Sequence, residues 1–324
     1  MNDPKSIDGV LVTWGDRLFF PSNRIVKSPP PSHLKDRTAA RAAVLRQRIA
    51  ATVVRRAPQV MVKVTGGGRG MRGIVAHLNY ISKRGRLKIE DERGHALSGK
   101  DAVNDLADQW RVGGSRIDEV SDRREAFNIM LSMPSGTNAH AVMQAAREFA
   151  QAELADHFYV MVLHEHQANP HVHLSVRAES KHGVRLNPRK ADLHRWRETF
   201  AEKLRGCGID AEATRQATRG QARNFDPLWQ VKAKAEGRLQ TSRTRVKAGE
   251  RARLTRLEAT EVWRHLAMAL ADSTEPGDRK LASAIDRFVR DANAVRRVGY
   301  PTRDVADAMQ EIDARPQLDP SRSR

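Results

Sequence analysis

The sequence predicts an α+β protein in which a mostly antiparallel central sheet is flanked by helices. Strand-like segments rich in β-branched residues are interleaved with segments whose apolar residues recur every three or four positions, as on one helix face. Two strand-like segments, 158–164 and 171–177, are joined by a short connection that contains Asn169-Pro170. Such a connection predicts a hairpin, whose two strands run antiparallel.

The first half of the predicted core begins with a strand over residues 59–65, which a glycine-rich segment at 66–70 ends. Ile74, Leu78 and Ile81 then follow at spacings of four and three, which places them on one face of a helix. The remaining elements of this half are a small hairpin that begins at 86–90 and a helix over 101–112.

The second half of the core has a clearer order. A strand at 126–133 leads through a turn to a helix for which Asn138 is the expected cap. The hairpin strands at 158–164 and 171–177 come next. The last helix opens after Asn187-Pro188 and ends at two glycines, Gly206 and Gly208, and its apolar face is made by Leu193, Trp196, Phe200 and Leu204.

This core is expected to be one domain over residues 58–222, with different segments on either side. Residues 1–57 contain a Pro-rich and an Arg/Ala-rich stretch and are interpreted as a basic arm, disordered or helical, with the solvated or disordered arm favoured. Residues 223–256 are interpreted as a basic linker. Residues 257–324 show helical periodicity, which predicts a small helical module and tail.

The charge of the chain indicates a polyanionic partner. Lys and Arg number 57 against 39 Asp and Glu, which gives a formal net charge of +18. Nucleic acid is the usual partner of such a chain, with an anionic membrane surface or an acidic protein as alternatives.

Cys207 is the only cysteine, which excludes an intrachain disulfide and a thiolate zinc cluster. Without a signal-peptide pattern or an apolar run of about 18 residues, a soluble cytoplasmic protein with no membrane insertion is expected.

A histidine cluster is the most informative segment, because four of the chain's 12 histidines fall at positions 164, 166, 171 and 173. Residues i and i+2 of a strand point to the same face, so a tight hairpin would bring His164, His171 and His173 together. Three imidazoles can hold a divalent metal and leave coordination positions open for a substrate oxygen. Exposed histidines without a metal and a purely structural metal are the alternatives, and Asn169 and Glu165 are candidates for supporting the ligands.

This pattern, His-x6-His-x-His with Asn-Pro inside it, resembles the third motif of the relaxases, the mobilisation nucleases of the HUH endonuclease superfamily. Residues 76–82, Ala-His-Leu-Asn-Tyr-Ile-Ser, resemble the first motif of the MobP-like branch, which includes the TraI-type and VirD-type T-DNA border endonucleases. The strand that ends at Ser132 resembles the second motif. The resemblance covers about residues 60–222.

The resemblance implies a palm-like fold and a relaxase that nicks one DNA strand at a plasmid or integrative-element origin of transfer, for conjugative transfer. It implies that Tyr80 attacks the phosphate and remains as a 5′-phosphotyrosine, and that His164, His171 and His173 hold the metal. Mg²⁺ or Mn²⁺ is the first expectation, with Zn²⁺, Ni²⁺ or Co²⁺ as alternatives. The family commonly has Asp where this chain has His166, so the proton acceptor for Tyr80 is left open between His166, Glu165 and the metal-bound environment.

The resemblance also implies contacts with DNA and with other proteins. Single-stranded or supercoiled DNA at the origin, relaxosome accessory proteins and a type IV secretion coupling protein are the expected partners, in the bacterial cytoplasm with export alongside the DNA as an option. In the family the Ser of the second motif helps to hold DNA. The expected DNA contacts are therefore Ser132 and the cations that flank the tyrosine motif, Lys63, Arg69, Arg72, Lys83, Arg84 and Arg86.

Three other functions are compatible with parts of this pattern. A rolling-circle replication initiator would use the same metal and tyrosine chemistry. A non-catalytic DNA-binding accessory protein of the relaxosome would fit the charge, but it would not need Tyr80 and three histidines together. A metallohydrolase that uses bound water would still cut DNA if Tyr80 were replaced by Phe.

Overall fold

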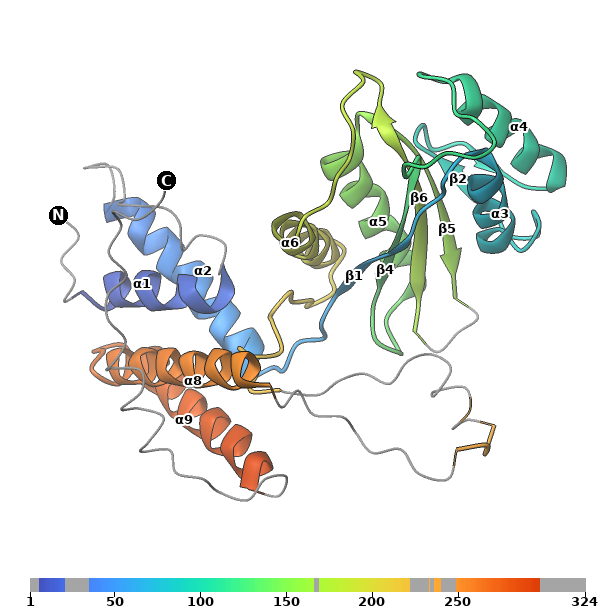
Figure 1. Ribbon diagram of the computed structural model, residues 1–324. Helices are drawn as coiled ribbons and strands as arrows, with labels where there is room; N and C mark the ends of the chain where they lie inside the picture. The colour runs from blue at the N-terminus through green and yellow to red at the C-terminus, as the bar shows by residue number, and fades with distance from the viewer. Residues whose placement is uncertain are drawn as a thin grey trace, which may run out of the picture. The chain divides into compact units, whose positions relative to one another are not determined.

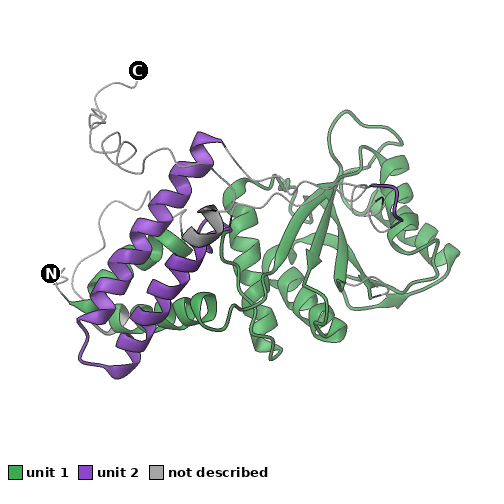
Figure 2. Cartoon of the chain, turned by 90° about the horizontal axis from the view of Figure 1, so that it is seen from below, with its two compact units in different colours: residues 1–215 green, residues 216–324 purple. Residues whose placement is uncertain are grey.

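The computed structural model describes residues 6–20, 35–165, 169–221, 233, 236–239 and 249–297. The chain divides into two compact units, residues 1–215 and residues 216–324 (Figure 2). The predicted core falls almost entirely in the first unit.

A six-stranded sheet forms the centre of the first unit (Figure 1). Its strands lie in the order β1-β4-β6-β5-β2-β3, and every neighbouring pair is antiparallel. The predicted α+β class with a mostly antiparallel sheet is therefore confirmed. The strands are β1 (Met61–Gly66), β2 (Ile89–Asp91), β3 (Ala96–Leu97), β4 (Ala126–Ser132), β5 (His157–His164) and β6 (His171–Ser180).

Helices cover both faces of this sheet, two on each (Figure 1). The helices α5 (Ala139–Leu154) and α6 (Lys190–Gly206) pack on one face. The helices α3 (Met71–Ile81) and α4 (Lys100–Val112) pack on the other. The side chain of Asn138 accepts a hydrogen bond from the N–H of Ala141, as expected for the cap of α5.

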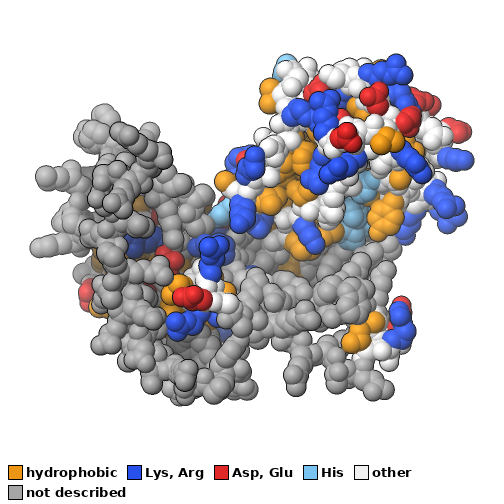
Figure 3. Space-filling view, viewed as in Figure 1, with side chains coloured by type: hydrophobic (Ala, Val, Ile, Leu, Met, Phe, Trp, Pro, Cys, Tyr) orange, Lys and Arg blue, Asp and Glu red, His pale blue; other side chains and the backbone are white. Residues whose placement is uncertain are grey.

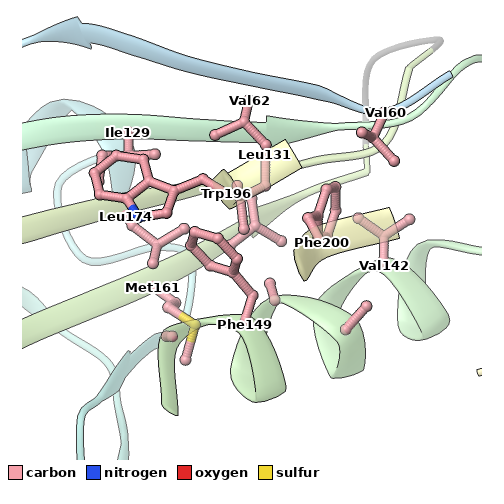
Figure 4. Packing of buried hydrophobic residues seen from close by; sticks show 14 of the residues in the cluster. Val60, Val62, Ile129, Leu131, Val142, Phe149, Met161, Leu174, Trp196 and Phe200 are labelled. Carbon is pink, nitrogen blue, oxygen red and sulfur yellow. The ribbon is translucent and has the colours of Figure 1, made fainter. Parts of the chain in front are cut away.

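Alternation along the strands divides the apolar side chains between two cores. Leu131 and Leu174 point toward α5 and α6, where they meet Phe149 and Trp196 (Figure 4). Val162 and its neighbours on the other face pack against α3 and α4. Both faces of the central strands are therefore largely buried, as the near-continuous apolar runs of β4 and β5 require.

The N-terminal segment is a pair of packed helices, which corrects the preferred interpretation of a solvated or disordered arm. The helices α1 (Ile7–Phe19) and α2 (Lys35–Val53) bury Leu11, Leu18, Leu45 and Ile49. Arg48 of α2 forms ion pairs with Glu212, at 3.0 Å, and with Glu198 of α6, at 3.0 Å. The helical alternative is therefore the one the described residues adopt.

The second unit contains a helical hairpin, as predicted for the C-terminal module. It consists of α8 (Glu250–Ala271) and α9 (Pro276–Arg297). The helix α8 begins at Glu250, so the end of the predicted linker at 223–256 is helical. Most of that linker and the tail after residue 297 lie outside the described residues. Among the helices that are described, none is long and apolar enough to cross a bilayer.

Candidate active site and metal centre

The central strands bring the three predicted metal ligands to one end of the sheet. His171 of β6 lies opposite His164 of β5 on one side and opposite Ser132 of β4 on the other. His173, two residues further along β6, lies opposite Met130 of β4. Residues that are directly opposite share a face of the sheet. All three histidines therefore lie on the face that carries α3 and α4.

The three imidazole rings form a compact cluster. Their centroids lie 5.1 Å apart for His164 and His171, 4.7 Å for His164 and His173, and 5.0 Å for His171 and His173. One ring nitrogen from each lies within 4.8 Å of the other two. Because Zn–N bonds are about 2.0–2.1 Å long, one ion could bind all three nitrogens after small side-chain movements.

Two of these rings have their second nitrogen bound to backbone carbonyl oxygens. Nε2 of His164 lies 2.7 Å from the carbonyl oxygen of Ile81, and Nδ1 of His171 lies 2.9 Å from that of Asn169. A carbonyl oxygen can only accept, so each ring donates an N–H there. A metal would therefore be bound through the other ring nitrogen of each, Nδ1 of His164 and Nε2 of His171.

The surroundings of the third ring, His173, show whether the site suits a metal. Nδ1 of His173 is buried and has no hydrogen-bond partner among the described residues. Burial, together with the neighbouring His164 and His171, lowers the pKa of His173 to about 3, so the ring is neutral near pH 7. A buried polar atom without a partner costs stability unless a ligand satisfies it. Three imidazoles in this arrangement fit a divalent cation.

Tyr80 lies beside this cluster, near the end of α3. Its ring centroid is 6.5 Å from that of His173, and its side chain is 70% exposed. Tyr159 is buried in the core, and Tyr300 lies outside the described residues. Figure 3 shows histidine side chains reaching the surface, with hydrophobic side chains beside them and Lys and Arg side chains around them. A large substrate could therefore reach both the phenol and the histidines.

His77 is a member of this site that the sequence analysis did not single out. Its ring lies 6.4 Å from that of Tyr80 and 6.4 Å from that of His173, measured between centroids. Nε2 of His77 is buried without a partner among the described groups, and burial lowers the pKa of His77 to about 4. The signal available in the sequence was its spacing, because residues three apart on a helix share a face.

Of the other two predicted catalytic residues, the described part of the chain includes Glu165 but not His166. Glu165 is exposed and follows directly after β5. Asn169, a predicted supporting residue, contacts the cluster through its backbone carbonyl oxygen, which accepts the N–H of His171. The proton acceptor for Tyr80 therefore stays open.

Ser132 is buried at the end of β4, where its hydroxyl lies 3.4 Å from the carbonyl oxygen of Pro170. The same carbonyl accepts the N–H of Met133 at 3.1 Å. Both contacts fix the chain directly before His171. In this geometry Ser132 supports the start of β6, while the DNA contact expected from the resemblance stays a prediction.

The predicted phosphate contacts are all at the surface. Lys63 lies opposite Met130, which in turn lies opposite His173, so Lys63 is on the same face of the sheet two strands away. Lys83 and Arg84 follow Tyr80 directly after α3 ends. The exposed cations are Lys63, Arg69, Arg72, Lys83, Arg84 and Arg86. Arg69 also donates to the carbonyl oxygen of Asp122, at 3.0 Å.

Comparisons with known proteins bear on this region. Residues 80–209 match a family model described as relaxase, MobA/VirD2-like, nuclease domain. The T-DNA border endonuclease VirD2 of Rhizobium radiobacter is 27% identical over 182 residues, which is 50% of this chain and 43% of the relative. The VirD2 proteins of Agrobacterium fabrum and Rhizobium rhizogenes are each 27% identical over 50% of this chain and 41% and 42% of their own lengths. The chain thus spans less than half the length of these relatives. No solved structure matches it.

Proposed function

The chain contains a nuclease domain of the MobA/VirD2-like relaxase family, and from that premise we propose that it nicks one DNA strand with Tyr80 as the nucleophile. One observation carries the proposal: an exposed tyrosine whose ring lies 6.5 Å from His173 in a cluster of three histidines. Three relatives carry the name T-DNA border endonuclease, which supports DNA as the substrate. The resemblance found in the motifs is confirmed at the level of the family.

We propose that His164, His171 and His173 hold a divalent cation. When bound, the ion would act as a Lewis acid on a non-bridging oxygen of the scissile phosphate and offset the charge that develops there. An all-imidazole donor set suits Zn²⁺, Ni²⁺ or Co²⁺ better than Mg²⁺, which prefers oxygen ligands. Of the two metals expected first, Mn²⁺ is the transition-metal ion and binds nitrogen ligands more readily than Mg²⁺, so it is the ion chosen for the experiments.

Tyr80 supplies the nucleophilic oxygen. Its phenol oxygen would form a bond to phosphorus while the bond from phosphorus to the 3′ oxygen breaks, which leaves a 5′-phosphotyrosine and a 3′ hydroxyl. A free phenol has a pKa of about 10, so the proton must pass to a nearby acceptor as the bond forms. His166 and Glu165 remain the candidates from the sequence, together with the metal-bound environment. One phosphodiester replaces another, so the strand can later be rejoined by the reverse reaction.

The exposed cations around Tyr80 would hold the DNA backbone. Lys83 and Arg84 lie next to the nucleophile in the chain, and Lys63 lies on the same sheet face as His173. Contacts of this kind are independent of the DNA sequence and weaken as the salt concentration rises.

We propose an origin of transfer on a plasmid or integrative element as the substrate. Relaxosome accessory proteins and a type IV coupling protein are the proposed partners, with action in the bacterial cytoplasm and export with the DNA.

The proposal is tested by adduct formation on denaturing gels. Labelled single strands that tile the genetic element encoding the protein are incubated with the full chain and Mn²⁺. The wild type should produce one labelled DNA–protein adduct, and Tyr80→Phe and His171→Ala should produce none. Tyr159→Phe is the matched control, because Tyr159 is buried in the core and should be dispensable for the reaction.

Other outcomes support other functions. Cleavage without an adduct that survives in Tyr80→Phe would indicate a metallohydrolase that uses water. Salt-sensitive binding to every tile without cleavage would favour the non-catalytic accessory protein. Adduct formation at a replication origin, and not at a transfer origin, would favour the rolling-circle initiator.

A further inference from the structure

We propose that the turn after α3, residues 82–85, couples the tyrosine to the metal ligand His164, with Ser82 as its positioning residue. The inference rests on the proposed function, because it concerns the metal and the nucleophile of the same site. It assigns a role to Ser82, which touches neither the substrate nor the metal and acts through the backbone.

The backbone of this turn is left-handed over three consecutive residues. The φ angles of Lys83, Arg84 and Gly85 are 51°, 59° and 80°. This region is unfavourable for residues that carry a Cβ, so two successive non-glycine residues in it mark a conformation that the surroundings impose. The helix α3 ends at Ile81, immediately before this turn, because a left-handed backbone cannot continue a right-handed helix.

The hydroxyl of Ser82 accepts a backbone N–H that would donate to a different oxygen if the helix continued. In an α-helix the N–H of residue 85 would donate to the carbonyl oxygen of residue 81. Here the N–H of Gly85 donates to the hydroxyl oxygen of Ser82 at 3.0 Å, and Ser82 is fully buried. The carbonyl of Ser82 also accepts the N–H of Leu87 at 2.9 Å. The side chain of Ser82 therefore takes the place of the Ile81 carbonyl.

The carbonyl oxygen of Ile81 is consequently available to the metal ligand. Nε2 of His164 donates to it at 2.7 Å, so the ring would bind the cation through its other nitrogen, Nδ1. Ile81 is the next residue after Tyr80, and its own side chain is buried. One hydrogen bond thus ties the end of the nucleophile's helix to the ring that would bind the metal.

The far end of the turn is also fixed. The carbonyl of Gly85 accepts the N–H of Gly99 at 2.9 Å. A Cβ on Gly85 would lie 2.4 Å from the carbonyl carbon of Gly99, so this position requires glycine. With Ser82 at one end and Gly85 at the other, the strained residues Lys83 and Arg84 are held between two anchored points.

Ser82→Ala removes the hydroxyl that accepts the Gly85 amide. That amide would then compete with His164 for the Ile81 carbonyl, and the ring of His164 would no longer be held in one tautomer. Loss of such supporting contacts typically lowers metal affinity about 10–100-fold. We expect a decrease of that size in Mn²⁺ affinity, measured without DNA by the electron paramagnetic resonance signal of free Mn²⁺, and a parallel decrease in the single-turnover rate of adduct formation.

Ser180→Ala is the matched control. Ser180 is also buried, and its hydroxyl accepts the N–H groups of His182 and Val184 in a turn at the other end of β6. This variant should lose similar thermal stability but keep wild-type Mn²⁺ affinity.

The tautomer of His164 gives a test that needs no variant. In metal-free wild-type protein labelled with ¹⁵N-histidine, nuclear magnetic resonance should show the proton of His164 on Nε2. A proton on Nδ1 would overturn the proposal, and so would wild-type Mn²⁺ affinity in folded Ser82→Ala or an equal loss of affinity in Ser180→Ala. These measurements use no DNA, so a failure of DNA nicking by the wild type would count against the proposed function and not against this coupling.

Discussion

The two ends of strand β6 carry polar side chains on the same face of the sheet, but their polar atoms are satisfied in different ways. At one end Arg177 is 2% exposed, and its guanidinium donates to three carbonyl oxygens, those of Trp110, Gly113 and Ser115. At the other end, buried ring nitrogens of His173 and His77 have no partner among the described residues.

The difference separates a structural role from a functional one. A buried charge that donates to three backbone carbonyl oxygens holds the surrounding chain in place, here the loop after α4. A buried nitrogen without a partner reduces stability, and the proposed cation would give the nitrogen of His173 a partner. Position on the strand and burial alone would not distinguish the two ends, because Arg177 and His171 are both buried on the same face.

The largest expected effect is at the histidine end. His173→Ala removes one of the three proposed ligands, and we expect adduct formation to fall by more than about 100-fold. Replacing a residue that only supports a metal ligand already lowers metal affinity or activity about 10–100-fold. The thermal midpoint of metal-free protein should change little, since the replaced nitrogen had no partner. A large drop in that midpoint would show that the two ends do not differ as described.

Arg177→Leu tests the other end of the strand. It leaves three buried carbonyl oxygens without their donor, which should destabilise the fold by about 3 kcal/mol or more. Urea denaturation measures this loss. Mn²⁺ affinity of the folded fraction should equal that of the wild type, and a parallel loss of metal binding would indicate that Arg177 belongs to the site.

A smaller effect is expected at the cation next to the nucleophile. Lys83→Gly removes a proposed phosphate contact and relieves a left-handed backbone at a φ of 51°. The slope of log affinity against log salt should therefore decrease by about 1. Thermal stability should be equal or higher, because a side chain in this region costs roughly 1–2 kcal/mol. An unchanged salt slope would remove Lys83 from the DNA interface.

The smallest expected effect concerns Glu125, which directly precedes β4 at the end of the sheet that carries Arg177. Burial favours its protonated form, but hydrogen bonds from Arg123 and Ser121 and the charge of Arg185 outweigh it and lower the pKa of Glu125 below 4.5. Its stabilising contribution is therefore present above about pH 4.5 and is lost as the pH falls through the lower folded value. Thermal melts from pH 7 to pH 3 should show a smaller acid loss for Glu125→Gln than for wild type.

Much of the fold could be predicted because its signals are local. The strand-like segments 126–133 and 171–177 predict β4 and β6, and the spacing of Ile74, Leu78 and Ile81 predicts α3. The same period of two predicts that His171 and His173 share a face, which the strand register places beside His164.

The N-terminal helices were interpreted incorrectly because their stability depends on distant residues. An Arg/Ala-rich stretch with little apolar content is typical of a solvated arm. Arg48, however, pairs with Glu198 and Glu212, which lie more than a hundred residues further along the chain. Local composition does not contain that information.

Parts of the site were also beyond sequence reasoning. A single histidine on a helix, such as His77, carries no signal of its burial in the sequence. The role of Ser82 depends on a left-handed turn and on a carbonyl oxygen left available to His164, and backbone geometry of this kind is not encoded by residue type alone.

The most direct test of the central claim is to identify the residue that carries DNA after the reaction. The adduct formed with an origin strand and Mn²⁺ is digested with nuclease and protease, and its peptides are sequenced by tandem mass spectrometry. We predict a nucleotide joined through its 5′ phosphate to Tyr80 and to no other residue. A nucleotide on a different side chain, or a cleaved strand with no modified peptide, would contradict a tyrosine nucleophile beside the three histidines.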